Sequence, residues 1–305
     1  MGTVHDIIEA NGRQGALALD VDRAIVDAAS AYMADEDAGV GYLYSGWCQA
    51  ALPHKRLPDA EGWQVEGDRL CLIVEPGMRR GPGGSPVHVG VPFGSRARLI
   101  LIYLQSEALR TKSRNVVLGS SLRRWLVRLK IPVCGKNFTA VREQTERLSR
   151  CRLTFEVRKG MRVGMASQNV FDTAVFLDDD AGQSSLFTQH ARLSEAFFEG
   201  LQRHPVPIED AAISAISNNS QAMDIYVWLA YRLHSLTKPT PISWRALKVQ
   251  FGAGVAAMSN FKLRFTPNLK LALAVYPKAK VEEDGERGLI LYPSPPPVSK
   301  LVSAA

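Results

Sequence analysis

Hydrophobic positions along this 305-residue chain recur with two different spacings, one typical of helices and the other of strands. Helical spacing predicts helices over residues 17–34, 95–109, 119–131, 138–150, 220–236, 243–251 and 258–276. Short apolar runs bounded by turn-forming residues predict strands over 69–75, 87–91, 116–118, 153–157, 170–177, 278–282 and 288–292, with a further short strand at Ile242. The Gly/Pro/Arg-rich segment 76–86 is expected to be a loop. Together these elements predict an α+β fold.

A helix, a short glycine-containing turn, a second helix with a polar face and a β-hairpin follow one another twice along the chain. In the first copy, Leu122, Leu126 and Leu129 share the inner face of the first helix, and Asn137 is positioned to cap the second. On that second helix, inward positions are predicted for Val141, Thr145 and Leu148, and outward positions for Arg142, Glu143, Glu146 and Arg147. This order predicts a helix-turn-helix followed by the wing of a winged helix.

The second copy has the same order without obvious sequence identity. Ser243 is expected to cap a helix with Leu247, Val249 and Phe251 inward. Pro267 lies inside the next helix, which therefore either kinks there or starts anew. The sequence predicts two tandem winged-helix domains, over residues 86–180 and 181–305, the second with a proline-rich tail. An acidic extension with helix and strand, residues 1–85, precedes them.

The charge distribution points to a partner. The whole chain carries a net charge of +7, but residues 94–160 alone carry +12, most of it from arginine. Such a block repels itself unless a polyanion or an acidic partner neutralises it, and arginine can fork two hydrogen bonds onto phosphate or guanine. We therefore expect double-stranded DNA as the partner. The acidic first 40 residues either contact a host protein or help to hold a dimer.

The candidate DNA-binding residues are basic or polar side chains of the two helix-turn-helix units and the first hairpin, because helix side chains can enter the major groove and wings reach phosphates or the minor groove. In the first unit they are Arg123, Arg124, Asn137, Thr139, Arg142, Gln144 and Arg147. In the first hairpin they are Arg158, Lys159 and Arg162, and in the second unit Arg245, Lys248, Ser259, Asn260, Lys262, Arg264 and Lys270. Gln144 either reads adenine or supports internal packing. The second hairpin is acidic and is expected to face away from DNA or toward a protein.

Motifs for catalysis, metals and cofactors are missing from the sequence. The histidines show neither H-x-H nor H-E-x-x-H spacing, and no G-x-x-x-x-G-K-[ST] loop occurs. The four cysteines, Cys48, Cys71, Cys134 and Cys151, form no C-x-x-C pair and are expected to be reduced and mostly buried. We therefore expect a protein that is not an enzyme and needs no cofactor or metal. No apolar run approaches the ~20 residues that cross a bilayer, so no membrane partner and a cytoplasmic location are expected.

Several short blocks, in this order along the chain, resemble those of a known family. They are YLYSGWCQ (42–49), LPHK (52–55), VPFGSRARL (91–99), SEALRT (106–111), LGSSL (118–122), MDIYVWLAYRL (223–233) and AVYP (274–277). The chain from about residue 42 to about residue 293 resembles plasmid-encoded RepA-type replication initiators, the RepA C-terminal-domain family. The resemblance implies binding to repeated origin sites (iterons), origin opening, and recruitment of the host replication initiator and replicative helicase. It also implies a monomer in one state and a homodimer, which represses its own promoter, in another.

Two other classes of function stay open at this point. A plain transcriptional repressor could use the same fold, and sequence does not separate initiation from repression. A DNA nicking enzyme is the rival from a different class, although the histidine pattern that holds its metal is missing. If the first helix assignment is right, Arg142→Ala together with Arg147→Ala abolishes specific binding without unfolding the protein.

Overall fold

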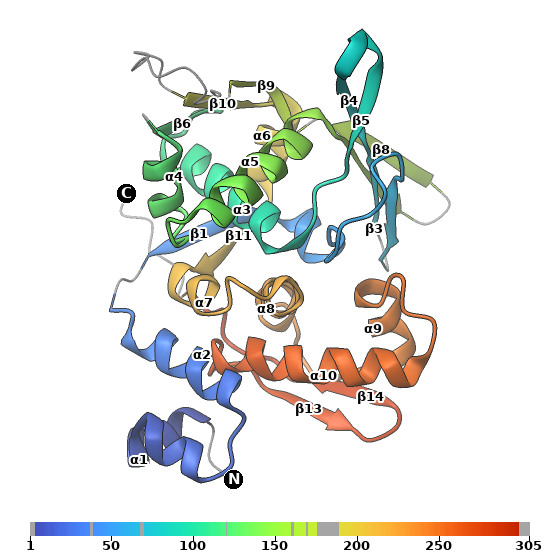
Figure 1. The fold of residues 1–305 in the computed structure, drawn as a ribbon. Helices are drawn as coiled ribbons and strands as arrows, with labels where there is room; N and C mark the ends of the chain where they lie inside the picture. Colours follow the sequence, from blue (N-terminus) through green and yellow to red (C-terminus); the bar gives the residue numbers. More distant parts are fainter. Residues whose placement is uncertain are drawn as a thin grey trace. The chain divides into compact units, whose positions relative to one another are not determined.

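The computed structural model describes residues 4–36, 39–67, 70–119, 121–159, 162–168, 170–175 and 189–298. Helices and strands are mixed along the chain, so the fold is α+β, as predicted (Figure 1). The described residues divide into two compact units: unit 1 draws on Met1–Gly41, Trp47–Ala51 and Val206–Ala305, and unit 2 on Tyr42–Gly46 and Leu52–Pro205. These units do not follow the predicted boundaries after residues 85 and 180; the division into three functional segments stays a prediction.

Unit 2 combines helices with antiparallel sheets. Its helices are η2 (Pro82–Gly84), α3 (Gly94–Arg110), α4 (Leu122–Arg128), α5 (Gly135–Arg150) and α6 (Glu195–Arg203). Its strands are β2 (Trp63–Glu66), β3 (Leu70–Glu75), β4 (Gly77–Arg80), β5 (Pro86–Gly90), β6 (Asn115–Gly119), β7 (Arg152–Lys159), β8 (Arg162–Gln168), β9 (Phe171–Val175) and β10 (Gln189–Leu193). They form a sheet of order β2-β3-β7-β8, a sheet of order β6-β10-β9 and a separate β4–β5 hairpin.

The core of unit 2 lies around α3, which is buried along most of its length because its apolar residues occupy nearly every turn. Leu99, Ile100 and Leu104 are at most 5% exposed. Helix α5 packs on α3 through Val141 and Leu148, and α4 contributes the fully buried Trp125. The buried Gln105 donates to the Leu101 carbonyl and accepts from the Tyr44 backbone N–H, so its polar groups are satisfied. This core fixes α4 and α5.

Unit 1 is mostly helical. Its helices are α1 (Val4–Ala18), α2 (Arg23–Ala34), α7 (Asp210–Ala215), α8 (Ser220–Leu233), α9 (Trp244–Phe251) and α10 (Met258–Ala274). Its strands β12 (Thr240–Ser243), β13 (Val281–Asp284) and β14 (Gly288–Leu291) form an antiparallel sheet of order β12-β14-β13. The chain changes unit within β1 (Val40–Tyr44) and β11 (Pro205–Glu209), and around η1 (Ser45–Cys48).

An aromatic cluster holds the helices of unit 1 together. Trp244 of α9 makes edge contacts with Phe261 and Phe265 of α10, at ring-centroid distances of 6.5 and 6.0 Å. Phe251 makes an edge contact with the Trp228 ring of α8 and a tilted contact with the Phe265 ring. Such edge-to-face pairs stabilise by about 0.5–1.5 kcal/mol each beyond their buried area. Figure 1 shows α10 next to α2 and α8, the helices that it contacts.

Several predicted elements are confirmed at nearly the expected bounds, namely α3, β6, α8, α9, α10 and the β13–β14 hairpin. The predicted helix 17–34 is wrong in its first part, because Asp20 adopts a left-handed φ of 60° and Asp22 caps α2 through the Ala24 and Ile25 N–H groups. The predicted loop 76–86 contains β4. The hairpin partner of β7 is β8, and β9 pairs elsewhere.

Candidate nucleic-acid interface

Helix α4 presents three arginines on the side away from the core, namely the two predicted residues Arg123 and Arg124 together with Arg128. Ser121 caps the helix by accepting from the Arg124 N–H at 3.3 Å, and Leu122, Trp125 and Leu126 are buried. Arg123, Arg124 and Arg128 are therefore exposed. Arg128 also donates to the Tyr103 hydroxyl and to the Val117 carbonyl, both at 3.2 Å, which fixes α4 against its neighbours.

Helix α5 begins earlier than predicted. Its N-cap is Cys134, so Asn137 lies inside the first turn, and the expected capping role of Asn137 is wrong. The Asn137 amide instead donates to the Pro132 carbonyl at 2.7 Å and accepts from Arg96 at 3.1 Å, which holds the turn between α4 and α5. Thr139 and Arg142 are exposed as predicted. Lys136, exposed three residues before Thr139, extends this polar stripe and was missed, although the same helical spacing points to it.

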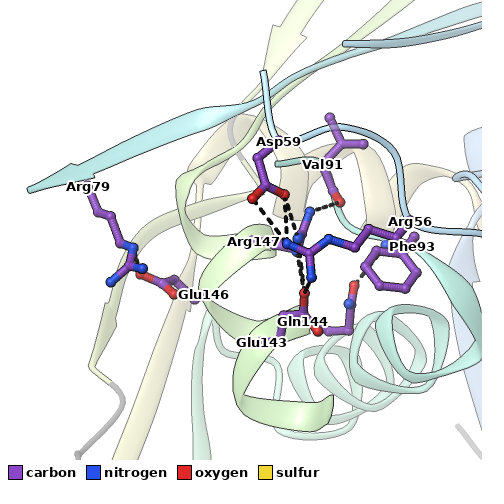
Figure 2. Close-up of polar contacts among 9 residues, drawn as sticks. All are labelled: Arg56, Asp59, Arg79, Val91, Phe93, Glu143, Gln144, Glu146 and Arg147. Atoms are coloured by element: carbon purple, nitrogen blue, oxygen red, sulfur yellow. Dashed lines mark hydrogen bonds and ion pairs between the residues drawn. The ribbon is translucent and has the colours of Figure 1, made fainter. Parts of the chain in front are cut away.

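Arg147 lies inside unit 2, and its predicted outward orientation is wrong. The side chain belongs to a residue that is 2% exposed, and its guanidinium donates to the Val91 carbonyl at 3.0 Å and to Asp59 and Glu143 at 2.9 Å each (Figure 2). It also stacks 5.2 Å from the Phe93 ring centre. Because Arg147 follows the buried Gln144 by three residues, α5 turns both toward the core.

Arg147 is the centre of a charge network that joins α5 to the segment before β2. Arg56 donates to Asp59 at 3.1 Å and lies 3.4 Å from Glu143, so two arginines and two carboxylates balance one another. Burial raises the pKa of Asp59, but the hydrogen bonds and charges of Arg147 and Arg56 outweigh that effect and hold it below the usual 3.8. The network is therefore a structural clamp.

Gln144 is buried and supports internal packing, which is one of the two roles that the sequence left open for it. It is 3% exposed, and its side-chain oxygen accepts from the Phe93 N–H at 2.7 Å, at the start of α3 (Figure 2). An amide held in this way satisfies an otherwise orphaned helix N–H group. In this structure Gln144 and Arg147 have no exposed surface to offer to DNA.

The first predicted wing corresponds to the β7–β8 hairpin. Its strands pair up to Lys159 opposite Arg162, so Arg158, Lys159 and Arg162 lie at the closed end. Gly160, Met161 and the side chains of these three basic residues fall outside what the structure describes. Their predicted contact with phosphates stays a prediction.

In unit 1, α10 presents a polar face with one large apolar residue at its centre. Phe261, Phe265 and Leu269 are buried, and the opposite side exposes Ser259, Asn260, Leu263, Arg264, Pro267 and Lys270. Leu263 is 75% exposed. A single exposed leucine is common on protein surfaces, so Leu263 alone does not mark a partner site. On α9, Arg245 is exposed, and so is Val249, whose predicted inward position is wrong.

Lys248 and Lys262 are half-buried and have internal partners. Lys248 donates to the Ala256 carbonyl at 2.8 Å, and Lys262 donates to Glu286 at 2.9 Å while lying 5.2 Å from the Trp244 ring centre. The hydrogen bond from Lys262 lowers the pKa of Glu286. Asn268, following Pro267, bonds to Gln221 and Asn219. The side chains of Lys248, Lys262 and Asn268 are therefore engaged in contacts within unit 1 and are not part of the exposed face of α10.

Helix α10 runs through Pro267 without ending there, so the predicted alternative that a new helix starts at Pro267 is wrong. Proline lacks the N–H that would reach the Leu263 carbonyl, one turn earlier. The next hairpin, β13–β14, carries exposed carboxylates at Glu282, Glu283 and Glu286, as its sequence predicted. Whether it faces a protein stays a prediction.

Two arginines that the sequence reasoning did not select stand on the β4–β5 hairpin. Arg79 and Arg80 are exposed, and Arg79 lies 3.8 Å from Glu146 of α5 (Figure 2). The segment was interpreted as a loop because glycine and proline dominate it. The alternation in Val87-His88-Val89 and the glycine turn were the available signals for a hairpin.

The described part of the chain has no group of three His, Cys, Asp or Glu side chains placed to hold a metal ion. Within the same residues, no helix is both long and apolar enough to span a membrane. Cys48, Cys71 and Cys151 are buried thiols and Cys134 is exposed; burial raises the pKa of Cys151 to about 12.

The fold and these surfaces define an α+β protein with polar, arginine-bearing helix faces. Residues 91–245 match the family model described as plasmid encoded RepA protein, and this match spans half of the chain. The chain therefore belongs to that family, which confirms the resemblance seen in its sequence blocks. No curated protein matches the chain.

Two solved structures are similar in fold. A crystal structure of selenomethionine derivatives of domain 2 and domain 3 of RctB matches 84% of this chain and 99% of that chain, at 12% identity and a TM-score of 0.53. A crystal structure of RctB domains 2–3 matches 81% of this chain and 95% of that chain, at 10% identity and a TM-score of 0.47. The first likeness shows a shared fold.

Proposed function

We propose that the protein initiates replication of a plasmid by binding double-stranded DNA at the origin through two winged helices, one in each unit. Membership of the RepA family supports this proposal. In unit 1 the order α8-β12-α9-α10-β13-β14, with the sheet β12-β14-β13, is the order of a winged helix. In unit 2 the order α3-β6-α4-α5-β7-β8 is the same, although β6 pairs with β10 rather than with the hairpin.

The observation that carries the proposal is the exposed face of α10. Asn260 and Arg264 are one helical turn apart on that face, with Leu263 beside them. Asparagine can bond two groups of adenine, arginine two groups of guanine, and an apolar side chain can contact the thymine methyl. The buried aromatic side of α10 holds the helix rigid while this face reads bases. Ser259, Lys270 and Arg245 of α9 add phosphate contacts.

In unit 2, the proposed reading helix is α5, through Thr139 and Arg142 near its N-terminal half. Arg123 and Arg124 of α4 would bind phosphate, and Arg158, Lys159 and Arg162 of the β7–β8 hairpin would follow the backbone as a wing. Gln144 and Arg147 are left out of this surface because they are buried and bonded within the unit. Asn137 is left out as well, since its amide holds the α4–α5 turn.

The finer parts of the function follow from the family and belong to the same proposal. The DNA sites are repeated origin sequences, binding helps to open the origin, and the host initiator and replicative helicase are recruited. The protein acts in the cytoplasm, as a monomer at the origin and as a homodimer in autoregulation, and it needs no catalytic residue, metal or cofactor.

Substitution of the α10 face tests the proposal. Asn260→Ala with Arg264→Ala should weaken binding to the cognate origin fragment by roughly 1–3 kcal/mol for each base contact, while affinity for scrambled DNA changes much less. Arg232→Ala, which also removes an exposed arginine from a unit 1 helix, is the matched control and should bind as the wild type does. Unchanged discrimination in the double variant, with its fold intact by circular dichroism, would contradict the role of α10.

A further inference from the structure

A basic hairpin lies beside α5, and its first strand and its tip precede the first predicted winged-helix domain, which begins at residue 86. Residues 77–90 form it, with β4 paired to β5 and the tip closed at η2. The segment contains Arg79 and Arg80 and no acidic residue. From Met78 to Pro86 every residue except Gly81 is exposed, and Figure 1 shows the tip standing clear of the other ribbons of unit 2.

The base of the hairpin is fixed to α5 on both strands. A side chain at Gly77 would overlap the backbone of Arg150, and a side chain at Gly90, where φ is +78°, would overlap the Arg147 guanidinium. Arg150 also donates to the Met78 carbonyl at 3.1 Å. Only glycine permits such close approach at both positions. The hairpin is therefore held in a fixed place relative to α5.

The shape and charge of the far end suit a polyanion. The tip holds Gly83 and Gly84 at φ of 75° and 88°, and the Gly81 N–H donates to the Ser85 carbonyl at 2.8 Å, so it is narrow and carries no bulky side chain. The guanidinium of Arg80 lies close to this tip, since a Cβ added at Gly84 would be 3.6 Å from its Nη2 atom. At the base, the single carboxylate of Glu146 lies near both Arg79 and Arg150, which leaves a net positive charge.

We propose that this hairpin is a third DNA-binding element, an arm that contacts the phosphate backbone beside the segment that α5 reads. Arg79 and Arg80 supply the contacts. The inference rests on the proposed function, since it assigns a further surface to the same DNA. A contact to phosphate strengthens binding equally for all sequences, so the arm adds affinity and sets position but does not discriminate between bases.

The test is a double variant, Arg79→Ala with Arg80→Ala, titrated by fluorescence anisotropy against cognate and scrambled duplexes over a salt series. Each phosphate contact contributes about 0.9 to the slope of log K against log salt, so the slope should become shallower by about 2. From the same relation, affinity at about 0.1 M salt should fall by up to roughly 60-fold on both duplexes. The ratio of cognate to scrambled affinity should stay as in the wild type.

Two further proteins make the result specific. Arg79→Lys with Arg80→Lys keeps both charges and should retain most of the affinity and of the slope. Arg13→Ala with Arg203→Ala removes the same charge from exposed ion pairs elsewhere and should change neither. If the wild type binds its cognate site but Arg79→Ala with Arg80→Ala leaves affinity and slope unchanged, the proposed role of the hairpin is wrong and the proposed function still stands. If the wild type binds no DNA, the proposed function fails as well.

Discussion

The buried position of Arg147 separates two arginines on one helix, because Arg147 has a structural role while Arg142 keeps only its proposed role in DNA binding. Arg147 is bonded to Asp59, Glu143 and the Val91 carbonyl, whereas Arg142 is exposed. Removing one partner of a buried charge network leaves the others uncompensated. The sequence predicted that Arg142→Ala together with Arg147→Ala leaves the protein folded. With Arg147 buried, the two substitutions are instead expected to have different effects on stability.

Arg147→Ala should lower the free energy of unfolding by about 2–4 kcal/mol, because its carboxylate partners are only partly exposed and lose their hydrogen bonds. Arg142→Ala should leave the unfolding free energy within about 0.5 kcal/mol of the wild type. Urea unfolding followed by tryptophan fluorescence measures both. An Arg147→Ala protein as stable as the wild type would contradict the structural role of the network.

Because the pKa of Asp59 is lowered, the stability of unit 2 is expected to depend on pH in the acidic range. A carboxylate whose folded pKa lies below its unfolded value of about 3.8 contributes stability above that value and loses it as the pH falls through the folded pKa. The wild type should therefore lose stability more steeply below about pH 4 than Asp59→Asn, which should be the less stable protein at pH 7. Urea midpoints across this range measure the difference; parallel curves would show that the charge of Asp59 does not matter.

Position 147 shows why the candidate site could be predicted only in part. The outward stripe of Lys136, Thr139 and Arg142 follows from helical spacing within α5. The burial of Arg147 depends on Asp59, 88 residues away in sequence, and no local pattern contains that partner. A charged residue at the edge of an apolar stripe is usually solvated, and only the fold decides otherwise.

Among the elements, long amphipathic helices were predicted well and pairings between distant segments were not. The apolar spacing of α3, α8 and α10 extends over several turns, which makes the pattern clear. The pairing of β6 with β10 joins segments about 75 residues apart and depends on tertiary packing. The hairpin β4–β5 was missed because its glycines and prolines are typical of loops as well as of tight turns.

Helix α10 continues through Pro267, and the proline is expected to lower the free energy of unfolding of unit 1. Proline in a helix interior removes one hydrogen bond and is about 3 kcal/mol less favourable than alanine. Pro267→Ala should therefore raise the free energy of unfolding by roughly 1–3 kcal/mol. Pro277→Ala, just beyond the helix end at Ala274, is the control and should have little effect. Thermal unfolding compares the two; a destabilised Pro267→Ala protein would show that α10 needs the proline ring.

At the scale of the whole molecule, charge and fold point to the same kind of partner. The net charge of +12 over residues 94–160 falls mainly on α3, α4, α5 and β7 of unit 2. In unit 1, Lys262 of α10 pairs with Glu286 of the acidic β13–β14 hairpin, a hairpin that phosphates would repel. Each unit therefore offers one helix face to DNA in the proposed function.

Both units are proposed to read DNA, and hydroxyl-radical footprinting of the wild type on the replicon's own origin tests this directly. Two protected segments are expected in each bound site. Asn260→Ala with Arg264→Ala should lose one segment, and Arg142→Ala should weaken the other. Protection of a single segment that is unaffected by the α10 substitutions, or no protection of any origin sequence at moderate salt, would contradict the account.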